Sequence, residues 1–529
     1  MKKALSILAA VCCLLTATIA QNPNNPNAKL NLVVGNFSGD YSNAQRINVI
    51  RELCNAHRAN VIEQGVYNAL PQNIRDKMRI DAVITGKCTI TTERKESKQK
   101  QKDGTQKTVI NYETNFTTDL TLADPATGKA ILTPVFKSSA TKEDRDESIK
   151  AAIAIGHTEG KTIAFVMKQL LTLDEFLEDK YPLHGKIVTI DEMKKNTAQK
   201  VTVSLGSRDA IYRGQTYEIV SVKNGKEKNY GKLRVREINS DTTSTLSVEK
   251  GGKDIIKAFE NGDELQVVSY VQALSLNGIV RVEQEAPRLN TSSPDDAKRR
   301  NVALAAINGN APSDFVAAVR QQFKSNRRIN AHELGTAGCP ATDQLDGIAY
   351  GHYTGMHTSS RLVKAEDNLL QLKDYTEYST FIGWYLFIVD PRTGDILYSG
   401  NQSTTATSDK SADDATRKAI QSAADITSAT YSAFPLIGNI LTVDDEKAKT
   451  VTIDLGNAYP VYNGLRFDVY TEDPNGGWEK IGRIEVQSIT DASHATCHVK
   501  KGGERIRKAL EENHPTRIST FILKEFFDL

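Results

Sequence analysis

Three short stretches of this 529-residue sequence carry residue types that could do chemistry. The first, GHTEGKT at residues 156–162, resembles a phosphate-binding loop. That motif needs four residues between its glycines, and only three separate them here. The stretch also lies inside AAIAIGHTEGKTIAFVMKQLL, whose composition and spacing predict a helix rather than a strand-to-helix turn. We therefore expect no bound nucleotide or other cofactor, and predict a helix that contains two glycines.

The second stretch is HATCH, at residues 494–498, which contains metal-ligand side chains. On a β-strand its two histidines would share one face while Cys497 points to the other, so the three donors would not converge. An internal second copy, introduced below, has Thr243, Leu246 and Ser247 in the places of His494, Cys497 and His498. We expect solvent-facing polar residues above an apolar cysteine, and no metal.

The third stretch is GHYTGMH, at residues 351–357. In a regular strand His352 and His357 lie on opposite faces, and the other copy has Lys87 and Thr92 at the matching places. No Ser, His and Asp set has the context of a nucleophile elbow. The acidic pair Asp413–Asp414 falls where a helix start favours negative charge. The sequence therefore predicts no catalytic, cofactor-binding or metal residue.

The first twenty residues, MKKALSILAAVCCLLTATIA, have the pattern of a secretory signal peptide, and we expect cleavage after Ala20. Cys12 and Cys13 suggest a lipoprotein, but a lipid-modified cysteine needs a small residue before it, and Val11 or a cysteine stands there. No later stretch approaches about 18 uncharged apolar residues, the minimum for a spanning helix. We predict an exported protein that is periplasmic or associated with the outer membrane, with no integral membrane span.

Charge and cysteine content narrow the classes further. Removal of Lys2 and Lys3 leaves 67 − 2 = 65 basic residues against 65 acidic ones, so nothing attracts the mature chain to nucleic acid or an anionic membrane. The cysteines outside the leader are Cys54, Cys88, Cys339 and Cys497. Four cysteines in a chain of this length make no disulfide framework, so buried free thiols and up to two disulfides both stay open. The length predicts three or four domains.

The elements that must position these residues occur twice. VTVSLGSRDAIYRGQTYEIV, from Val201, aligns without a gap to VTIDLGNAYPVYNGLRFDVY, from Val451, at an offset of 250. PLHGKIVTID and PLIGNILTVD are 253 apart, DAVITG and DGIAYG are 265 apart, and the turns DPATG and DPRTG are 266 apart. Landmarks in one order, with offsets that drift as insertions would make them, indicate an internal duplication of a two-part unit.

The first part of the unit alternates strand and helix. We expect a strand at 30–37, a helix at 43–57 with an Asn43 cap, a strand at NVIEQ, a helix at PQNIRDKM, a strand from Asp81 and a hairpin closed by DPATG. A long helix from about 144 to 177 should follow, with a counterpart at about 411–431 in the second copy. This is a mixed α/β sheet with flanking helices.

The second part reads as short strands separated by glycine turns, which predicts a small all-β barrel or sandwich. The expected organisation is signal peptide 1–20, linker 21–29, α/β domain 30–181, β-domain 182–271, linker 272–297, α/β domain 298–434 and β-domain 435–529. The basic run 94–107 is expected to be a mobile solvated hairpin, with contact to a partner as the alternative. Each half of the chain is expected to fold alone.

These patterns resemble a known family. The order of a signal peptide, a VVGNF strand, a helix, NVIEQ and DAVITG is similar to the CsgG family of curli production, assembly and transport components. It also resembles the periplasmic domains of flagellar assembly protein T and the TolB amino-terminal domain. The segment from Val201 resembles the β-domain that follows in the flagellar protein. The shared motifs are structural, so the resemblance implies a fold and an envelope setting rather than a reaction.

The sequence departs from the curli channel in two respects. It lacks a credible lipid-attachment motif, and the insertion TTERKESKQKQKDGTQKTVINYE carries charge on both faces, which does not suit a strand facing lipid. We therefore expect a non-enzymatic scaffold that binds envelope or outer-membrane proteins. A curli-like secretion or outer-membrane assembly subunit and an envelope hydrolase are the alternatives, and homo-oligomerisation stays open.

Overall fold

The computed structural model describes residues 25–520 except 101–105, 145–158, 160, 163–165, 167–172, 224–225, 241, 271–297, 365–373, 446 and 473–477. The predicted signal peptide and the linker at 272–297 therefore lie outside the described residues. The chain forms two compact units, one of residues 30–177 and one of residues 25–29 and 178–529. The division between them falls at residue 178, more than 90 residues before the join between the two sequence copies.

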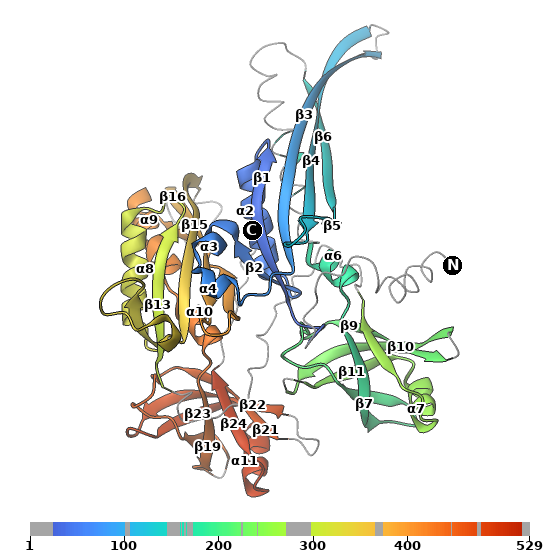
Figure 1. Cartoon of the computed structure of the whole chain (residues 1–529), viewed down its shortest axis with the longest axis vertical. Helices are drawn as coiled ribbons and strands as arrows, with labels where there is room; N and C mark the ends of the chain where they lie inside the picture. Colours follow the sequence, from blue (N-terminus) through green and yellow to red (C-terminus); the bar gives the residue numbers. More distant parts are fainter. Residues whose placement is uncertain are drawn as a thin grey trace. The chain divides into compact units, whose positions relative to one another are not determined.

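The first unit is built on a six-stranded mixed sheet with the order β2-β1-β3-β4-β5, and β6 pairs with β4 (Figure 1). β1 is parallel to β2 and β3, while β3, β4, β5 and β6 pair antiparallel. The strands are β1 (Leu30–Gly39), β2 (Ala59–Glu63), β3 (Ala82–Lys100), β4 (Gln106–Ala123), β5 (Ala130–Leu132) and β6 (Val135–Asp144). The helices are α2 (Ser42–Asn55), α3 (Gln64–Ala69), α4 (Gln72–Arg75) and α6 (Leu173–Lys180).

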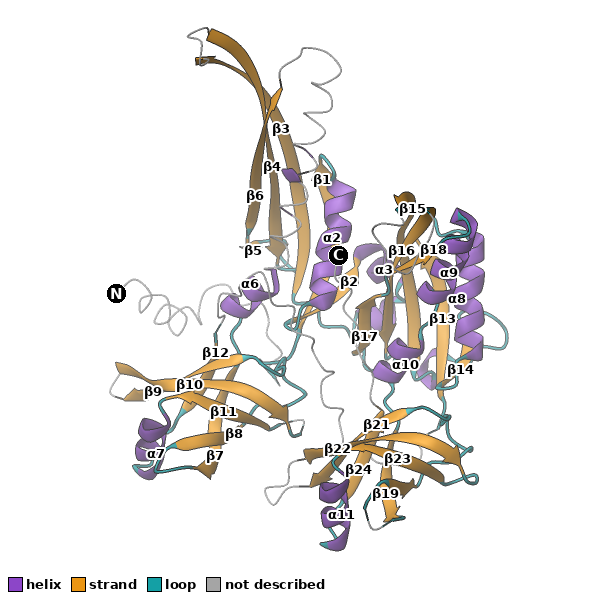
Figure 2. Cartoon of the chain, turned by 180° about the vertical axis from the view of Figure 1, so that it is seen from behind, coloured by secondary structure: helices purple, strands orange, loops and turns teal. Residues whose placement is uncertain are grey.

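A second sheet repeats this topology, with the order β14-β13-β15-β16-β17 and β18 paired to β16. Its strands are β13 (Arg300–Asn308), β14 (Ile329–Glu333), β15 (Gly347–Val363), β16 (Tyr375–Val389), β17 (Ile396–Asn401) and β18 (Thr404–Ser408). Its helices are α8 (Ser313–Ser325), the 3-10 turn η3 (Thr342–Gln344), α9 (Ala412–Ala423) and α10 (Thr427–Ala433). The helices α8 and α9 pack on one face of the sheet, around Trp384 (Figure 2).

A closed six-stranded barrel follows each sheet, and the two rings have the same strand order. The first consists of β7 (His184–Met193), β8 (Ala198–Val203), β9 (Thr216–Lys223), β10 (Lys226–Ile238), β11 (Ser244–Lys250) and β12 (Gln266–Ser269). The second consists of β19 (Ile437–Val443), β20 (Thr450–Ile453), β21 (Arg466–Glu472), β22 (Trp478–Ile489), β23 (Ala495–Lys501) and β24 (Thr516–Thr520). The predicted barrel is confirmed.

Each barrel also contains a helix that the all-strand prediction missed: α7 (Gly252–Glu260) and α11 (Gly503–Glu511). Both follow a glycine in the left-handed region, Gly251 at φ 88° and Gly502 at φ 78°. A Cβ at Gly251 would lie 1.8 Å from the Tyr230 carbonyl oxygen, and one at Gly502 would lie 1.9 Å from that of Ile481. The repeated Gly-Gly pair is therefore required by close backbone approach at the start of each helix.

The repeated DPxTG turns close hairpins, as predicted. In the first copy the Asp124 carboxylate accepts hydrogen bonds from the backbone N–H groups of Ala126 and Thr127, and Gly128 has a φ of 68°. In the second copy Asp390 accepts from the backbone N–H of Arg392. These turns join β4 to β5 and β16 to β17.

A β-bulge explains why the offset between the copies changes from 265 to 266. The pairing of β15 with β16 shifts register between Tyr353 and Gly355, whereas β3 and β4 pair without a shift along their whole length. One extra residue in β15 therefore separates DGIAYG from everything that follows. After the bulge the copies match again: the hydroxyls of Thr92 and Thr114 are 3.0 Å apart, as are those of Thr358 and Thr380.

The outer faces of the two sheets, opposite the helix-covered face, differ in chemistry. In the first sheet this face carries the cross-strand pairs Val83–Ala123, Thr85–Thr121 and Lys87–Asp119. In the second sheet the corresponding pairs are Ile348–Val389, Tyr350–Phe387 and His352–Tyr385. The five apolar and aromatic members of the second set are all buried, whereas Thr85 and Lys87 are exposed. The second sheet is thus buried on both faces near its base.

Several predicted helices differ in the structure. The helix at about 411–431 is two helices, α9 and α10, separated by residues 424–426. Ile426 is the N-cap of α10 without a side-chain cap, and the preceding Asp425 accepts the backbone N–H of Thr427. The helix expected from residue 144 cannot begin there, because β6 extends to Asp144. Helix α2 has Tyr41 as its N-cap, in the left-handed conformation and without a side-chain cap, rather than Asn43.

The described part of the predicted linker 21–29 is in contact with the first barrel. The Asn27 side-chain amide donates to the His184 carbonyl at 2.8 Å, and its oxygen accepts the His184 N–H at 2.9 Å. Asn25 donates to the carbonyl of Arg208 at 3.0 Å. Separately, none of the helices in the described ranges is long and apolar enough to span a bilayer.

Candidate functional site

The histidine of HATCH at position 494 lies in the turn before β23, and not on the strand as predicted. Asp491 accepts hydrogen bonds from the backbone N–H groups of Ser493 and His494, and with the His494 ring these hold its pKa at about 2. The His494 Nδ1 lies 2.9 Å from Asp491 and 3.0 Å from the Ser493 hydroxyl. A catalytic triad needs the acid and the nucleophile on different ring nitrogens. Because both share Nδ1 here, this group forms a turn and not a hydrolase centre.

The rest of that motif has the predicted orientation. Cys497 is buried opposite Val451, in the same register as Leu246 opposite Val201, and His498 is exposed. Burial raises the pKa of the Cys497 thiol to about 12, so it is a protonated core residue. Cys54 and Cys88 are also buried, Cys339 is partly exposed, and all four are free thiols. The alternative of disulfide pairing is therefore wrong in this structure.

His352 and His357 lie on the same sheet face, contrary to the prediction for a regular strand. His352 pairs with Tyr385 and His357 with Phe381, four residues apart on β16, because the bulge between them inverts the alternation. Four residues of strand separate the two side chains by about 13 Å, too far to share a metal ion. After the bulge the residue that matches His357 in the first copy is Thr91 rather than Thr92.

The described residues of the phosphate-loop-like stretch are helical, as predicted. Glu159, Lys161 and Thr162 are in helix, and the buried Thr162 hydroxyl donates to the Glu159 carbonyl at 2.9 Å. The other four residues of 156–162 lie outside the described part of the chain. Asp413 and Asp414 are in the first turn of α9, as predicted.

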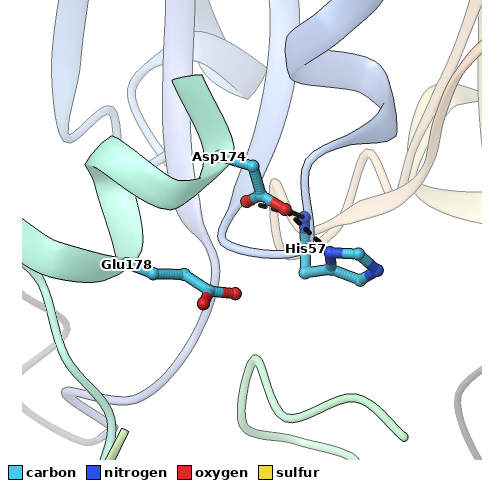
Figure 3. Close-up of side chains that lie close together, drawn as sticks. All are labelled: His57, Asp174 and Glu178. Carbon is cyan, nitrogen blue, oxygen red and sulfur yellow. Dashed lines mark hydrogen bonds and ion pairs between the residues drawn. The ribbon is translucent and has the colours of Figure 1, made fainter. Parts of the chain in front are cut away.

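A trio of metal-ligand side chains escaped the sequence analysis. His57 precedes β2, and Asp174 and Glu178 lie one turn apart on α6, with ligand atoms of the three within 4.8 Å (Figure 3). The Asp174 carboxylate lies 2.7 Å from the His57 Nδ1 and also accepts the backbone N–H groups of His57 and Arg58. Burial alone would raise the pKa of Asp174, but these hydrogen bonds outweigh it and lower the pKa.

The bonding of this trio indicates a fastening role. Both oxygens of Asp174 are already used by N–H groups, so the carboxylate ties the start of α6 to the turn before β2. The matching residues in the second copy, from the offsets of 270 and 253, are Arg327, Thr427 and Tyr431. An arginine, a threonine and a tyrosine do not replace zinc ligands, so the second copy does not repeat this set of metal-ligand side chains.

A second feature missed from the sequence is a buried arginine in each copy. Arg58 and Arg328 occupy the same place just before β2 and β14, and both side chains are fully buried. The Arg328 guanidinium donates to the Phe434 carbonyl at 2.6 Å, to the Pro435 carbonyl at 3.3 Å and to the Lys298 carbonyl. Phe434 and Pro435 follow α10, so Arg328 binds the segment that leads into the second barrel.

Other polar residues kept in both copies also bond to the backbone. Asp81 accepts the N–H of Asn31 at 2.7 Å, and Asp346 accepts that of Asn301 at 2.9 Å. The retained polar positions therefore hold strand ends in place, and in the described residues they do not converge on a cleft. These hydrogen bonds organise the backbone.

Comparisons with known proteins add little. No family model matches the chain, and no curated protein matches it. A protein from Helicobacter pylori described as a neuraminyllactose-binding hemagglutinin homolog has 11% identity and a TM-score of 0.21, over 29% of this chain and 88% of that protein. TolB from Acinetobacter baumannii has 12% identity and a TM-score of 0.15, over 30% of this chain and 36% of TolB. A lipoprotein from Neisseria meningitidis has 12% identity and a TM-score of 0.15, over 21% of this chain and 84% of that lipoprotein. Likenesses this weak carry no argument about function, and the resemblance to the CsgG family gains no support from a family model.

Proposed function

We propose that the protein is an exported, non-enzymatic scaffold of the bacterial envelope that binds other envelope proteins. The observation that carries this proposal is the β-ribbon of the first unit, formed by the distal parts of β3 and β4 together with β6 (Figure 1). β1 pairs with β3 only as far as Cys88, but β3 and β4 stay paired to Lys100–Gln106. The twelve residues 89–100 of β3 therefore run about 40 Å past the parallel part of the sheet.

The surface chemistry of the β-ribbon suits contact with protein. Thr91, Glu93 and Lys95 project from one face and are exposed, and the cross-strand Lys95–Glu113 ion pair measures 2.5 Å. Within the described residues, no strand pairs with the outer edge of β3 beyond Cys88 or with that of β6. Open edges are templates for strand pairing, and charged side chains limit unwanted pairing there.

Folding explains only part of the β-ribbon. On one face of its distal part Ile110, Tyr112 and Thr114 of β4 are buried, whereas the other face is exposed and polar, and ordering each residue costs about 1–2 kcal/mol of backbone entropy. A projecting, open-edged ribbon with one exposed polar face is what a protein-binding role requires. The envelope location rests on the leader sequence, which lies outside the described residues.

The proposal can be tested by cross-linking and pull-down of the full-length protein from the cell envelope. We expect the wild type to retain a defined set of envelope proteins, and the double variant Lys95→Glu, Lys98→Glu to lose at least part of that set. Arg361→Glu is the matched control, because Arg361 occupies the place of Lys95 in the second copy and also pairs with a glutamate, at 2.7 Å. Retention of no envelope protein by the wild type would refute the scaffold. A lipid on Cys12 or Cys13 would favour the secretion-subunit alternative.

A further inference from the structure

A small hollow lies on the second α/β domain, between the end of α8 and the edge strand β14. It encloses about 30 Å³, enough for one water molecule or one oxyanion oxygen. Its lining residues are Leu304, Arg320, Phe323, Lys324, Ala331, His332 and Glu333. An adjoining shallow depression shares Arg320 and Lys324 and extends along α8, so a larger group could lie with one oxygen in the hollow.

The first copy shows that the basic lining is particular to the second copy. At the offset of 270, Arg320, Lys324 and His332 replace Ile50, Cys54 and Ile62, which are all buried. The glutamate is kept, as Glu63 and Glu333. In the first copy Glu63 caps the following helix α3, whereas the chain after β14 turns without forming a helix there. Three positions that are apolar in the first copy therefore carry two cationic side chains and a histidine in the second copy, where they line the hollow.

The hydrogen-bonding capacity of the hollow is only partly used. Lys324 and Glu333 form an ion pair at 3.2 Å. Arg320 is exposed and has no ion-pair partner among the residues that the structure describes. His332 also lines the hollow, and its buried Nε2 lacks a hydrogen-bond partner in the same described part. A buried polar atom without a partner is costly, so rotation of the ring toward a ligand oxygen in the hollow would be favourable.

We propose that this hollow binds a small oxyanion, a carboxylate or phosphate group. The Arg320 guanidinium provides the main charge-assisted hydrogen bonds, and Lys324 and the His332 Nε2–H add donors. Glu333 opposes the anion by its own charge while it holds Lys324 in place. The site is independent of the β-ribbon, so failure of either proposal leaves the other unaffected.

The test is titration of the full-length protein by calorimetry, with inorganic phosphate and with acetate in separate experiments at low ionic strength. We expect saturable binding of one ion per chain for at least one of them. Arg320→Gln should weaken binding about tenfold or more, since a charge-assisted hydrogen bond contributes on the order of the free energy of one decade in affinity. Binding of phosphate alone or of acetate alone identifies the class of ligand.

Two further variants separate a built site from a charged surface. Glu333→Gln should tighten binding, because it removes the opposing carboxylate, whereas His332→Ile restores the first copy's side-chain type and should weaken it. Arg361→Gln, at an exposed arginine on the second sheet's β15, is the control and should change nothing. Fluorescence of the buried Trp384 verifies that each variant is folded. The proposal is overturned by absence of saturable binding, by equal effects of the Arg320 and Arg361 variants, or by weaker binding in Glu333→Gln.

Discussion

Replacement of Arg328 by methionine should loosen the second α/β domain and its connection to the second barrel. The guanidinium is fully buried and its hydrogen bonds go to carbonyls at the two ends of the domain: Lys298 before β13, and Phe434 and Pro435 after α10. These carbonyls would lose their donors in Arg328→Met. The partial negative charge at the end of α10 would also lose a nearby cation.

The size of the effect follows from opposing terms. Three hydrogen bonds from a charged donor contribute about 1.5–3 kcal/mol each. Methionine removes the cost of burying the charge, which is several kcal/mol, so much of that gain is cancelled. We expect a net loss of about 2–4 kcal/mol in the free energy of unfolding. Arg328→Lys should lose an intermediate amount, because an ammonium group cannot reproduce the planar fork of donors.

The chain provides a selective assay. Its two tryptophans, Trp384 and Trp478, both lie in the second copy, so urea unfolding followed by tryptophan fluorescence reports that copy alone. With a slope of about 1–3 kcal/mol per molar urea, the midpoint should fall by about 1–2 M in Arg328→Met. Arg58→Met, the equivalent change in the first copy, should leave this transition in place. An unchanged midpoint in Arg328→Met would show that the guanidinium does not fasten the domain.

Gln45 is fully buried, and neither of its amide atoms has a hydrogen-bond partner among the described residues; the second copy has Phe315 in its place. Gln45→Leu should raise the thermal midpoint, because an unsatisfied buried amide costs about 1–3 kcal/mol. Phe387→Lys should lower the thermal midpoint sharply because a buried unpaired charge costs several kcal/mol, whereas Thr121→Lys at the matching, polar position should change it by less than about 1 kcal/mol. The pKa of Asp174 is lowered on folding, so its stabilising effect is complete above the ordinary value of about 3.9 and is lost as the pH falls from there through the lower folded-state value. Circular dichroism melts should therefore show Asp174→Asn less stable than the wild type at pH 7, with the difference shrinking as the pH is lowered below about 4.

The fold followed from the sequence where hydrophobic period and turn residues agree. Strands, hairpins and barrels were predicted because alternation and Gly or Asp-Pro turns are local signals. The change of offset from 265 to 266 was also visible, but only pairing along β15 shows that it is a bulge between Tyr353 and Gly355. Because that bulge inverts the alternation, the predicted faces of His352 and His357 could not be right without it.

The buried polar joints could not be predicted for a different reason. Arg328 stands in RRIN, a run that favours a solvated surface, and its partners are backbone carbonyls, which have no sequence signature. His57 and Asp174 are 117 residues apart, so no local pattern connects them. By contrast, the two-sided burial of β16 has a visible signal: WYLFIV is a continuous apolar run where the first copy alternates as TTDLTLA.

The differences between the two copies favour one shared fold that presents a different contact surface in each copy. What both copies keep is a set of backbone supports: the DPxTG turns, the Gly-Gly starts of α7 and α11, the carboxylates that hold Asn31 and Asn301, and the buried arginines. What differs includes the outer sheet faces, which are polar in the first copy and buried in the second, the side chains around the hollow beside β14, and the buried pair Gln45 and Phe315. A shared backbone frame with different outer sheet faces is what selection for two different binding partners would produce on one duplicated fold.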